Sequence, residues 1–253
     1  MTIRLLRLTN SDDLVSDAPP EQRAAAVAER ILAEASGEDV DAVMKAIWPK
    51  PELPGIIAGW VERYEPDLVI IRISSYWFTY ESVPLRLERA LGRWSGRLTK
   101  LGKDAAANQL IGHNRAFKLL QKGMLRTIGG ATLLTADQTV EVAEACLRPI
   151  LAREGVGVVV RGPRTPFGGF RSRAALLKSE EKRQYVNRRL AEVCQRHHIT
   201  FAPFESMEEV LDPGTRLGDG VHINARGQLL TGTMEGEALI REWRRVGAAA
   251  ERP

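Results

Sequence analysis

Residues 67–74 read Asp-Leu-Val-Ile-Ile-Arg-Ile-Ser, and this stretch decides the fold class. Four apolar residues follow one another, without the polar alternation of a strand that has one face in water. A continuous apolar run of this length is typical of a strand in a parallel sheet, because helices cover both faces of such a sheet. The sequence therefore predicts a buried parallel sheet between helices.

Segments on both sides of this stretch extend the same pattern. Shorter apolar runs predict strands over residues 3–8, 155–162 and 199–204. Amphipathic segments predict helices over residues 20–36, 52–65, 138–153 and 178–197, with a further helix at the C-terminal end. We expect Pro149 to kink or end its helix. Alternating strands and helices form α/β folds with right-handed crossovers, so the sequence predicts three layers, α/β/α.

The composition excludes several classes of protein. The 253 residues are long enough to bury a large core without disulfides or metals. Cys146 and Cys194 lie in helix-like apolar patterns, which favours two buried free thiols. No Cys-x-x-Cys pair or Cys/His cluster is present, so we expect no metal and no cofactor. No apolar run approaches ~20 residues and no signal-peptide pattern opens the chain, so we expect a cytoplasmic protein without a membrane partner.

Residues 85–135 interrupt the alternation and predict a helical insertion within one domain of residues 1–253. Residues 85–126 contain ten Lys or Arg residues and only two acidic residues, a net charge of +8. Leu87, Leu91, Trp94, Leu98 and Leu101 recur at helical spacing beside a basic stripe, which indicates an amphipathic helix. The basic face is either an ordinary solvated surface or a docking surface for an anionic substrate or partner. No nucleic-acid-binding motif accompanies the charge, so we do not expect a nucleic-acid partner.

The first candidate for chemistry is Asp219-Gly220-Val221-His222, just before the C-terminal helix. An Asp three residues before a His in a short turn can orient the imidazole, so that the imidazole acts as a general base. The structural alternative is that Asp219 forms a turn and His222 caps a helix.

The second candidate is Ser11, in Thr9-Asn10-Ser11-Asp12-Asp13-Leu14 directly after the first predicted strand. Loops at the carboxyl ends of parallel strands gather at one edge of the sheet, where His222 is also expected. A hydroxyl becomes a nucleophile when a base lies within reach, and His222 is suited to that role. The alternative is an ordinary polar turn.

Taken together, the two ends of the chain resemble the SGNH (GDSL-like) hydrolase family. That family opens with a strand and a Gly-Asp-Ser-Leu-like motif and closes with Asp-x-x-His before the last helix. The resemblance implies a flavodoxin-like α/β/α fold and a catalytic triad of Ser11, Asp219 and His222. It also sets residues 66–74 in the position of the family's second strand.

The sequence departs from the family in the donors that stabilise the oxyanion. The family carries Gly-x-Asn-Asp after the second strand, whereas this chain has Ser74-Ser75-Tyr76-Trp77, with Tyr76 at the place of the Asn. Either Ser74, Ser75 or Tyr76 therefore supplies the donor, or the site is weakened or inactive. Loss of one such donor typically costs ~10²–10³ in rate.

A loop rich in Gly, Pro and Arg follows the strand at 155–162 and begins at Arg161. Arginines there are suited to hold a carboxylate or phosphate of a substrate, and Arg161 is the first candidate. The alternative is a set of solvated loop arginines.

Three functions fit these observations. The first is an ester hydrolase of the esterase or deacylase type, acting on a small-molecule or glycan acyl ester through the triad. The second keeps the fold but lacks catalysis, and binds a ligand in the same cleft. The third is acyl transfer to another acceptor by the same three residues.

Overall fold

The computed structural model describes residues 2–10, 15–80, 131–164, 172–203, 213–215, 217 and 222–250. The chain divides into two compact units, one of Met1–Ser75 with Ala136–Pro253 and the other of Tyr76–Thr135. The predicted insertion at 85–135 falls within the second unit. Apart from residues 131–135, that insertion lies outside the described residues.

The first unit is built on a parallel sheet in the order β2-β1-β3-β4-β5. Its strands are β1 (Thr2–Thr9), β2 (Asp39–Ala46), β3 (Leu68–Arg72), β4 (Gly157–Arg161) and β5 (Thr200–Ala202). Every pairing within it is parallel. Strands β3 and β4 are buried along their whole length, as the apolar run at 67–74 predicts. The predicted fold class is confirmed.

Strand β2 was not predicted from the sequence. Strand β2 pairs with β1 over eight residues, so residues 66–74 form the third strand of the chain, not the second as expected. The reason is that β2 lies at the edge of the sheet and is only partly buried. Its sequence, Asp-Val-Asp-Ala-Val-Met-Lys-Ala, therefore carries charges between its apolar residues and gives a weak strand signal.

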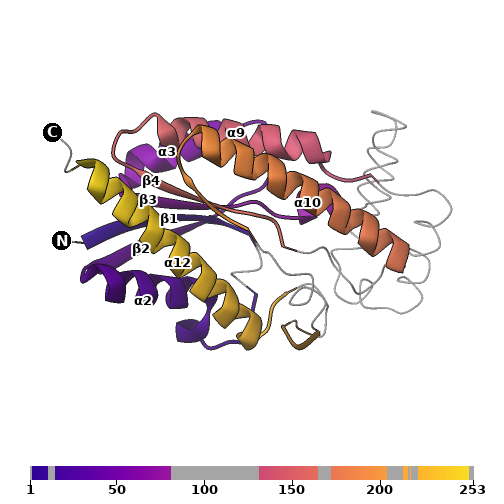
Figure 1. The fold of residues 1–253 in the computed structure, drawn as a ribbon, viewed down its shortest axis with the longest axis horizontal. Coiled ribbons are helices and arrows are strands. Elements are labelled where there is room, and N and C mark those ends of the chain that lie inside the picture. Colours follow the sequence, from indigo (N-terminus) through magenta and orange to yellow (C-terminus); the bar gives the residue numbers. More distant parts are fainter. Residues whose placement is uncertain are drawn as a thin grey trace, which may run out of the picture. The chain divides into compact units, whose positions relative to one another are not determined.

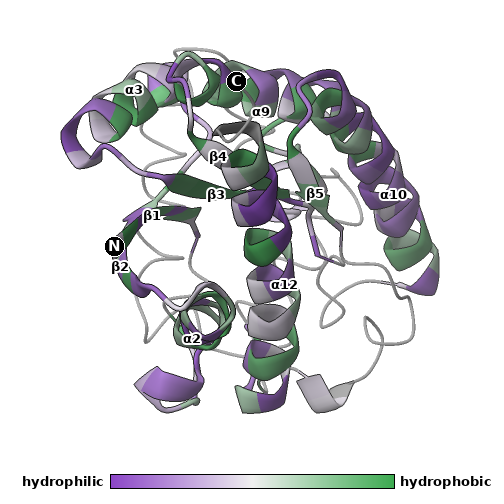
Figure 2. Cartoon of the chain, turned by 60° about the vertical axis from the view of Figure 1, so that its left-hand side comes forward, coloured by the Kyte–Doolittle hydropathy of each residue, from purple (hydrophilic) through white to green (hydrophobic). Residues whose placement is uncertain are grey.

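Helices cover both faces of the sheet (Figure 1). Helices α2 (Ala24–Ser36) and α12 (Ala225–Ala250) lie on one face, and α3 (Leu53–Tyr64), α9 (Ala136–Leu151) and α10 (Arg173–Arg196) on the other. Figure 2 shows β3 between these layers in the green of apolar residues. Helix α9 ends two residues after Pro149, as expected. None of the helices among the described residues is long and apolar enough to cross a lipid bilayer.

Helices α2 and α12 pack closely because α12 presents glycines to α2. A Cβ added at Gly232 would lie 2.7 Å from the carbonyl oxygen of Ala24 and 2.6 Å from Cβ of Val27. A Cβ added at Gly236 would lie 2.8 Å from Cβ of Ile31. Real Cβ atoms do not approach other atoms so closely, so the spacing of the two helices depends on glycine at both positions.

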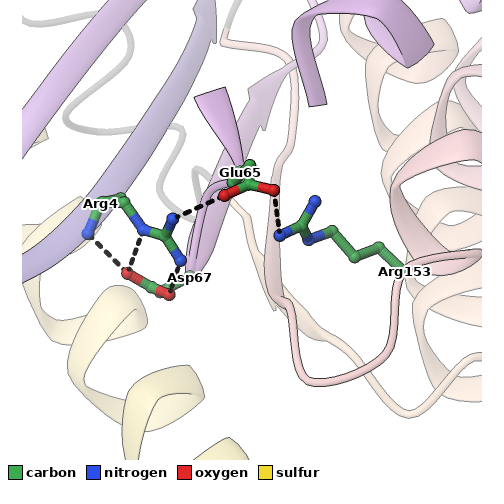
Figure 3. Close-up of polar contacts among 4 residues, drawn as sticks. All are labelled: Arg4, Glu65, Asp67 and Arg153. Atoms are coloured by element: carbon green, nitrogen blue, oxygen red, sulfur yellow. Dashed lines mark hydrogen bonds and ion pairs between the residues drawn. The ribbon is translucent and has the colours of Figure 1, made fainter. Parts of the chain in front are cut away.

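Ion pairs join three segments at the amino edge of the sheet, where the strands begin (Figure 3). The backbone N–H of Arg4 donates to Asp67 over 2.8 Å, and Arg4 Nη2 reaches the other oxygen of Asp67 at 2.8 Å. Glu65 lies 3.4 Å from Arg4 and 3.5 Å from Arg153. The cluster connects β1, the turn after α3 and the turn after α9, which leaves the carboxyl edge as the place for a site.

Candidate active site

The strand order itself singles out one place on the carboxyl edge. From β1 the chain goes first to β2 on one side and then to β3 on the other, so the connections diverge between β1 and β3. Ligands of open α/β sheets bind in the crevice outside such a switch point. Strand β1 ends at Thr9, two residues before Ser11, and β3 ends at Arg72, two residues before Ser74. Ser11 and Asp219 themselves lie outside the described residues.

The backbone at and after His222 is held by hydrogen bonds to Leu217 and to the short helix Pro213–Thr215. Leu217 N–H donates to the carbonyl of His222 over 2.9 Å. Two residues further on, Asn224 N–H donates to the carbonyl of Thr215 over 3.1 Å, and its side-chain amide donates to the carbonyl of Gly214 over 2.7 Å. These bonds hold the partly buried His222 in a defined loop before α12.

Asn224, not His222, caps helix α12. Its side-chain oxygen accepts from Gly227 N–H over 3.1 Å, which is the bond expected of an N-cap residue. Gly227 also lies where no side chain fits, because a Cβ would come within 2.4 Å of the carbonyl oxygen of Thr215. The structural alternative of a capping His222 is therefore wrong, because Asn224 fills the N-cap position.

The segment that follows Ser11 lies against the segment that follows His222. Ser16 Oγ lies 3.5 Å from the carbonyl oxygen of Ile223, 207 residues away in the chain. Ala24 N–H, at the start of α2, donates over 2.8 Å to the fully buried side chain of Gln228. These two contacts bring the loop after β1 and the loop before α12 to the same edge of the sheet.

Ser74 and Ser75 follow β3 at this edge, and Ser75 is the more buried of the two. The backbone before them is fixed to β4, because Ile73 N–H donates to the carbonyl of Arg161 over 3.0 Å. Two predicted donors thus lie in the turn directly after β3, the strand that pairs with β1.

Tyr76 belongs to the second unit and begins the short helix α4 (Tyr76–Thr79). Its ring stacks on that of Tyr80, with 4.4 Å between the ring centroids. Burial, and to a lesser degree the neighbouring Tyr80, raises the pKa of the Tyr76 hydroxyl, which therefore keeps its proton at neutral pH.

Arg161 was expected at the start of a loop, either holding a carboxylate or phosphate of a substrate or in solvent, and the structure places it instead at the end of strand β4. Its side chain is fully buried at the end of β4, and Nη1 lies 2.8 Å from Glu235 of α12. The other oxygen of Glu235 accepts from Arg7 of β1, which is also buried. Glu235 thus bridges the guanidinium groups of two strands, an interior role for Arg161.

Sequence reasoning missed Arg7, Glu235 and Glu29, although one signal was present. Ile3, Leu5 and Arg7 alternate along β1, and Ile3 and Leu5 belong to the core beneath α2 and α12. An arginine at the next inward position requires a buried carboxylate. Glu29 of α2 lies 3.8 Å from Arg7. Burial raises the pKa of Glu29, Arg7 opposes that shift, and Glu235 adds to it.

Among the described residues, no group of three or more His, Cys, Asp or Glu side chains is placed to hold a metal ion. Cys146 and Cys194 are buried free thiols, as expected. Burial raises the pKa of each thiol to about 12, so both stay protonated and unreactive at neutral pH.

Comparison with known proteins gives matches among solved structures. No family model and no curated protein matches the sequence. TesA superposes with a TM-score of 0.56 at 15% identity, over 96% of this chain and 99% of its own. Axe2, an acetyl-xylooligosaccharide esterase from Geobacillus, gives a TM-score of 0.53 at 14% identity, over 95% of this chain and 94% of its own.

A lipolytic protein of the G-D-S-L family from Desulfitobacterium hafniense has a TM-score of 0.52 at 12% identity, over 93% of this chain and 98% of its own. At such low identities the similarity concerns the fold alone, and it extends over nearly the whole length of each protein. The resemblance carried by the two ends of the sequence is confirmed at that level, and the chain therefore has the α/β/α fold of the SGNH (GDSL-like) esterases, in a divergent form.

Proposed function

We propose that the protein is a serine hydrolase that cleaves acyl esters with Ser11, His222 and Asp219. The observation that supports the proposal is that two hydrogen bonds join the segment after Ser11 to the segment after His222, one from Ser16 to Ile223 and one from Ala24 to Gln228. Ser11 precedes the first of these segments and His222 directly precedes the second. A nucleophile and a base at this edge are what ester hydrolysis on this fold requires.

In the proposed reaction, His222 takes the proton of the Ser11 hydroxyl while the oxygen attacks the acyl carbonyl. Asp219 orients the imidazole and stabilises its charged form. His222 then gives the proton to the leaving alcohol, which leaves an acyl group on Ser11. A water molecule, deprotonated by His222, then attacks the acyl carbon. The bond between the acyl carbon and the Ser11 oxygen breaks, His222 returns the proton to that oxygen, and the carboxylic acid leaves.

The oxyanion formed in both steps needs hydrogen-bond donors. We assign this role to the backbone N–H of Ser11 and to Ser74 or Ser75, which follow the neighbouring strand. No cofactor is needed for this chemistry. The esterases that share the fold support a small-molecule or glycan acyl ester as the substrate.

Replacing the nucleophile and the base tests the proposal. We expect Ser11→Ala and His222→Ala each to lower the hydrolysis of p-nitrophenyl esters by at least about 10³-fold. Ser36→Ala and His197→Ala are matched controls, because these residues lie at the amino-edge ends of α2 and α10. Both controls should keep wild-type rates. Full activity in Ser11→Ala or His222→Ala would refute the proposal.

The replacement of the family's Asn by Tyr76 favours an alternative, a binding protein without catalysis. A fluorophosphonate probe distinguishes this alternative from the hydrolase. The hydrolase predicts labelling at Ser11 that His222→Ala slows. The binding protein predicts no labelling, with ligands raising the melting temperature but not being turned over. Faster product formation on addition of an alcohol would indicate acyl transfer.

A further inference from the structure

We propose that Glu235 is a positioning residue, which fixes the His222 loop relative to the strand that leads to Ser11. It does so by binding two buried arginines of the sheet, Arg7 and Arg161. The proposal rests on the proposed function in its catalytic consequence, but its geometric part can be tested without activity.

The contacts of Glu235 join helix α12 to two strands. One carboxylate oxygen accepts from Arg7 of β1, and the other lies 2.8 Å from Nη1 of Arg161 of β4. All three side chains are at least 98% buried. Two guanidinium groups held on the two oxygens of one carboxylate define both the rotation of the helix and its position along its axis.

Burial raises the free-energy cost of keeping these three side chains charged. A charge taken out of water is retained only where opposite charges and hydrogen bonds compensate it. If Glu235 becomes neutral, Arg7 and Arg161 lose the charge that bridges them, although Arg7 keeps Glu29 of α2 as an acidic neighbour at 3.8 Å. The attraction that holds α12 to both strands at once is then lost. A shift of α12 is therefore the expected response, in addition to any loss of stability.

Both elements that Glu235 joins, strand β1 and helix α12, lead to residues of the proposed site. Arg7 lies four residues before Ser11 on β1. Helix α12 begins three residues after His222, and the loop of His222 is bonded to the start of that helix through Asn224. Any rotation or sliding of α12 against β1 thus changes the distance between the hydroxyl and the imidazole. An error of about 1 Å in such a pair is enough to cost ~10² in rate.

A second buried carboxylate on the same helix provides a matched control. Glu242 is also fully buried, and it accepts from Val158 N–H and from the hydroxyl of Thr200, each over 2.8 Å. It lies seven residues after Glu235, so it anchors the far half of α12, near the beginnings of β4 and β5. Loss of Glu242 should destabilise the protein without moving the His222 loop.

Distances between spin labels test the geometric part. One pair of labels is attached at Val15→Cys and Leu229→Cys, two exposed positions beside the site, and a second pair at Glu154→Cys and Arg244→Cys near the amino edge. The native thiols are buried, with a pKa of about 12, and do not react at neutral pH. Glu235→Gln should shift or broaden the 15–229 distances and leave the 154–244 distances unchanged. Glu242→Gln should shift or broaden the 154–244 distances and leave the 15–229 distances unchanged.

A second variant, Glu235→Asp, keeps the charge, but its side chain is too short to reach both arginines. This variant tests the proposal if Glu235→Gln does not fold. It should also broaden the 15–229 distances. In ester hydrolysis we expect both Glu235 variants to lower kcat by about 10²-fold with little change in KM, whereas Glu242→Gln keeps its kcat. Unchanged 15–229 distances would overturn the proposal whatever the activity. An inactive wild type with the predicted distance changes would instead refute the hydrolase and leave the positioning intact.

Discussion

At the scale of single residues, the loop before α12 shows how few groups fix the backbone at a candidate catalytic histidine. Asn224 caps the helix with its side-chain oxygen and binds the backbone of the preceding turn with its amide. Gly227 lets the first turn of the helix touch the carbonyl of Thr215. His222 lies between these contacts, so its backbone has little freedom of its own.

Gly227→Ala should disturb this loop. The added Cβ would lie 2.4 Å from the Thr215 oxygen and 2.9 Å from Cβ of Ile223, so the backbone at residues 222–224 has to move. We expect a loss of about 1–3 kcal/mol in the free energy of unfolding, and ester hydrolysis lowered by at least about tenfold. Urea unfolding and p-nitrophenyl ester assays measure the two effects. Gly247→Ala on the same helix meets no atom within 4 Å and should not lower either quantity.

At the scale of elements, α12 is the helix on which the site and the core both depend. It packs on α2 through Gly232 and Gly236, binds β1 and β4 through Glu235, and binds β4 and β5 through Glu242. Glu235 therefore holds the half of the helix beside the site and Glu242 holds the far half, so a change at one anchor acts mainly on its own half.

Gly232→Ala tests the close packing of α12 on α2. Its Cβ would meet backbone and Cβ atoms of α2, which cannot rotate away as a flexible side chain would. We expect a loss of about 1–3 kcal/mol and a lower melting temperature by calorimetry. Gly59→Ala, in the interior of α3 with no atom within 4 Å, should raise it slightly, because alanine favours the helix by up to ~1 kcal/mol. Equal melting temperatures for the two variants would contradict this account of the packing.

At the scale of the whole molecule, much of the architecture could be predicted from the sequence. The apolar runs at 67–74 and 155–162 contain fully buried strands, and the helix predicted over residues 20–36 is present as α2, which ends at Ser36. Strand β2 was missed because an edge strand needs few apolar residues. The bridge formed by Glu235 was missed because a carboxylate on a helix does not reveal which strands it will meet. Ser11 and Asp219 stay predictions, since they lie outside the described residues.

The amino edge should make stability depend on pH. Burial by itself would raise the pKa of Asp67, but the hydrogen bonds and charge of Arg4 outweigh it and lower that pKa. A carboxyl group with a depressed folded-state pKa stabilises the protein above its unfolded pKa of about 4 and loses that contribution as the pH falls through the folded value. We therefore expect Asp67→Asn to be less stable than wild type at pH 7, and the difference to shrink at pH 3. Urea midpoints at both pH values measure it, and a constant difference would contradict the assignment.

The position of α12 in the chain has a consequence for how the protein is made. Ala238 and Leu239 of this helix complete the core over Ile3, Leu5 and Leu68. During translation, the part of this sheet face that α2 does not cover therefore stays exposed until the segment from residue 225 onward has left the ribosome. The nascent chain presents that apolar face to chaperones for most of its synthesis, and a ribosome stalled before this helix would release a product that is prone to aggregate.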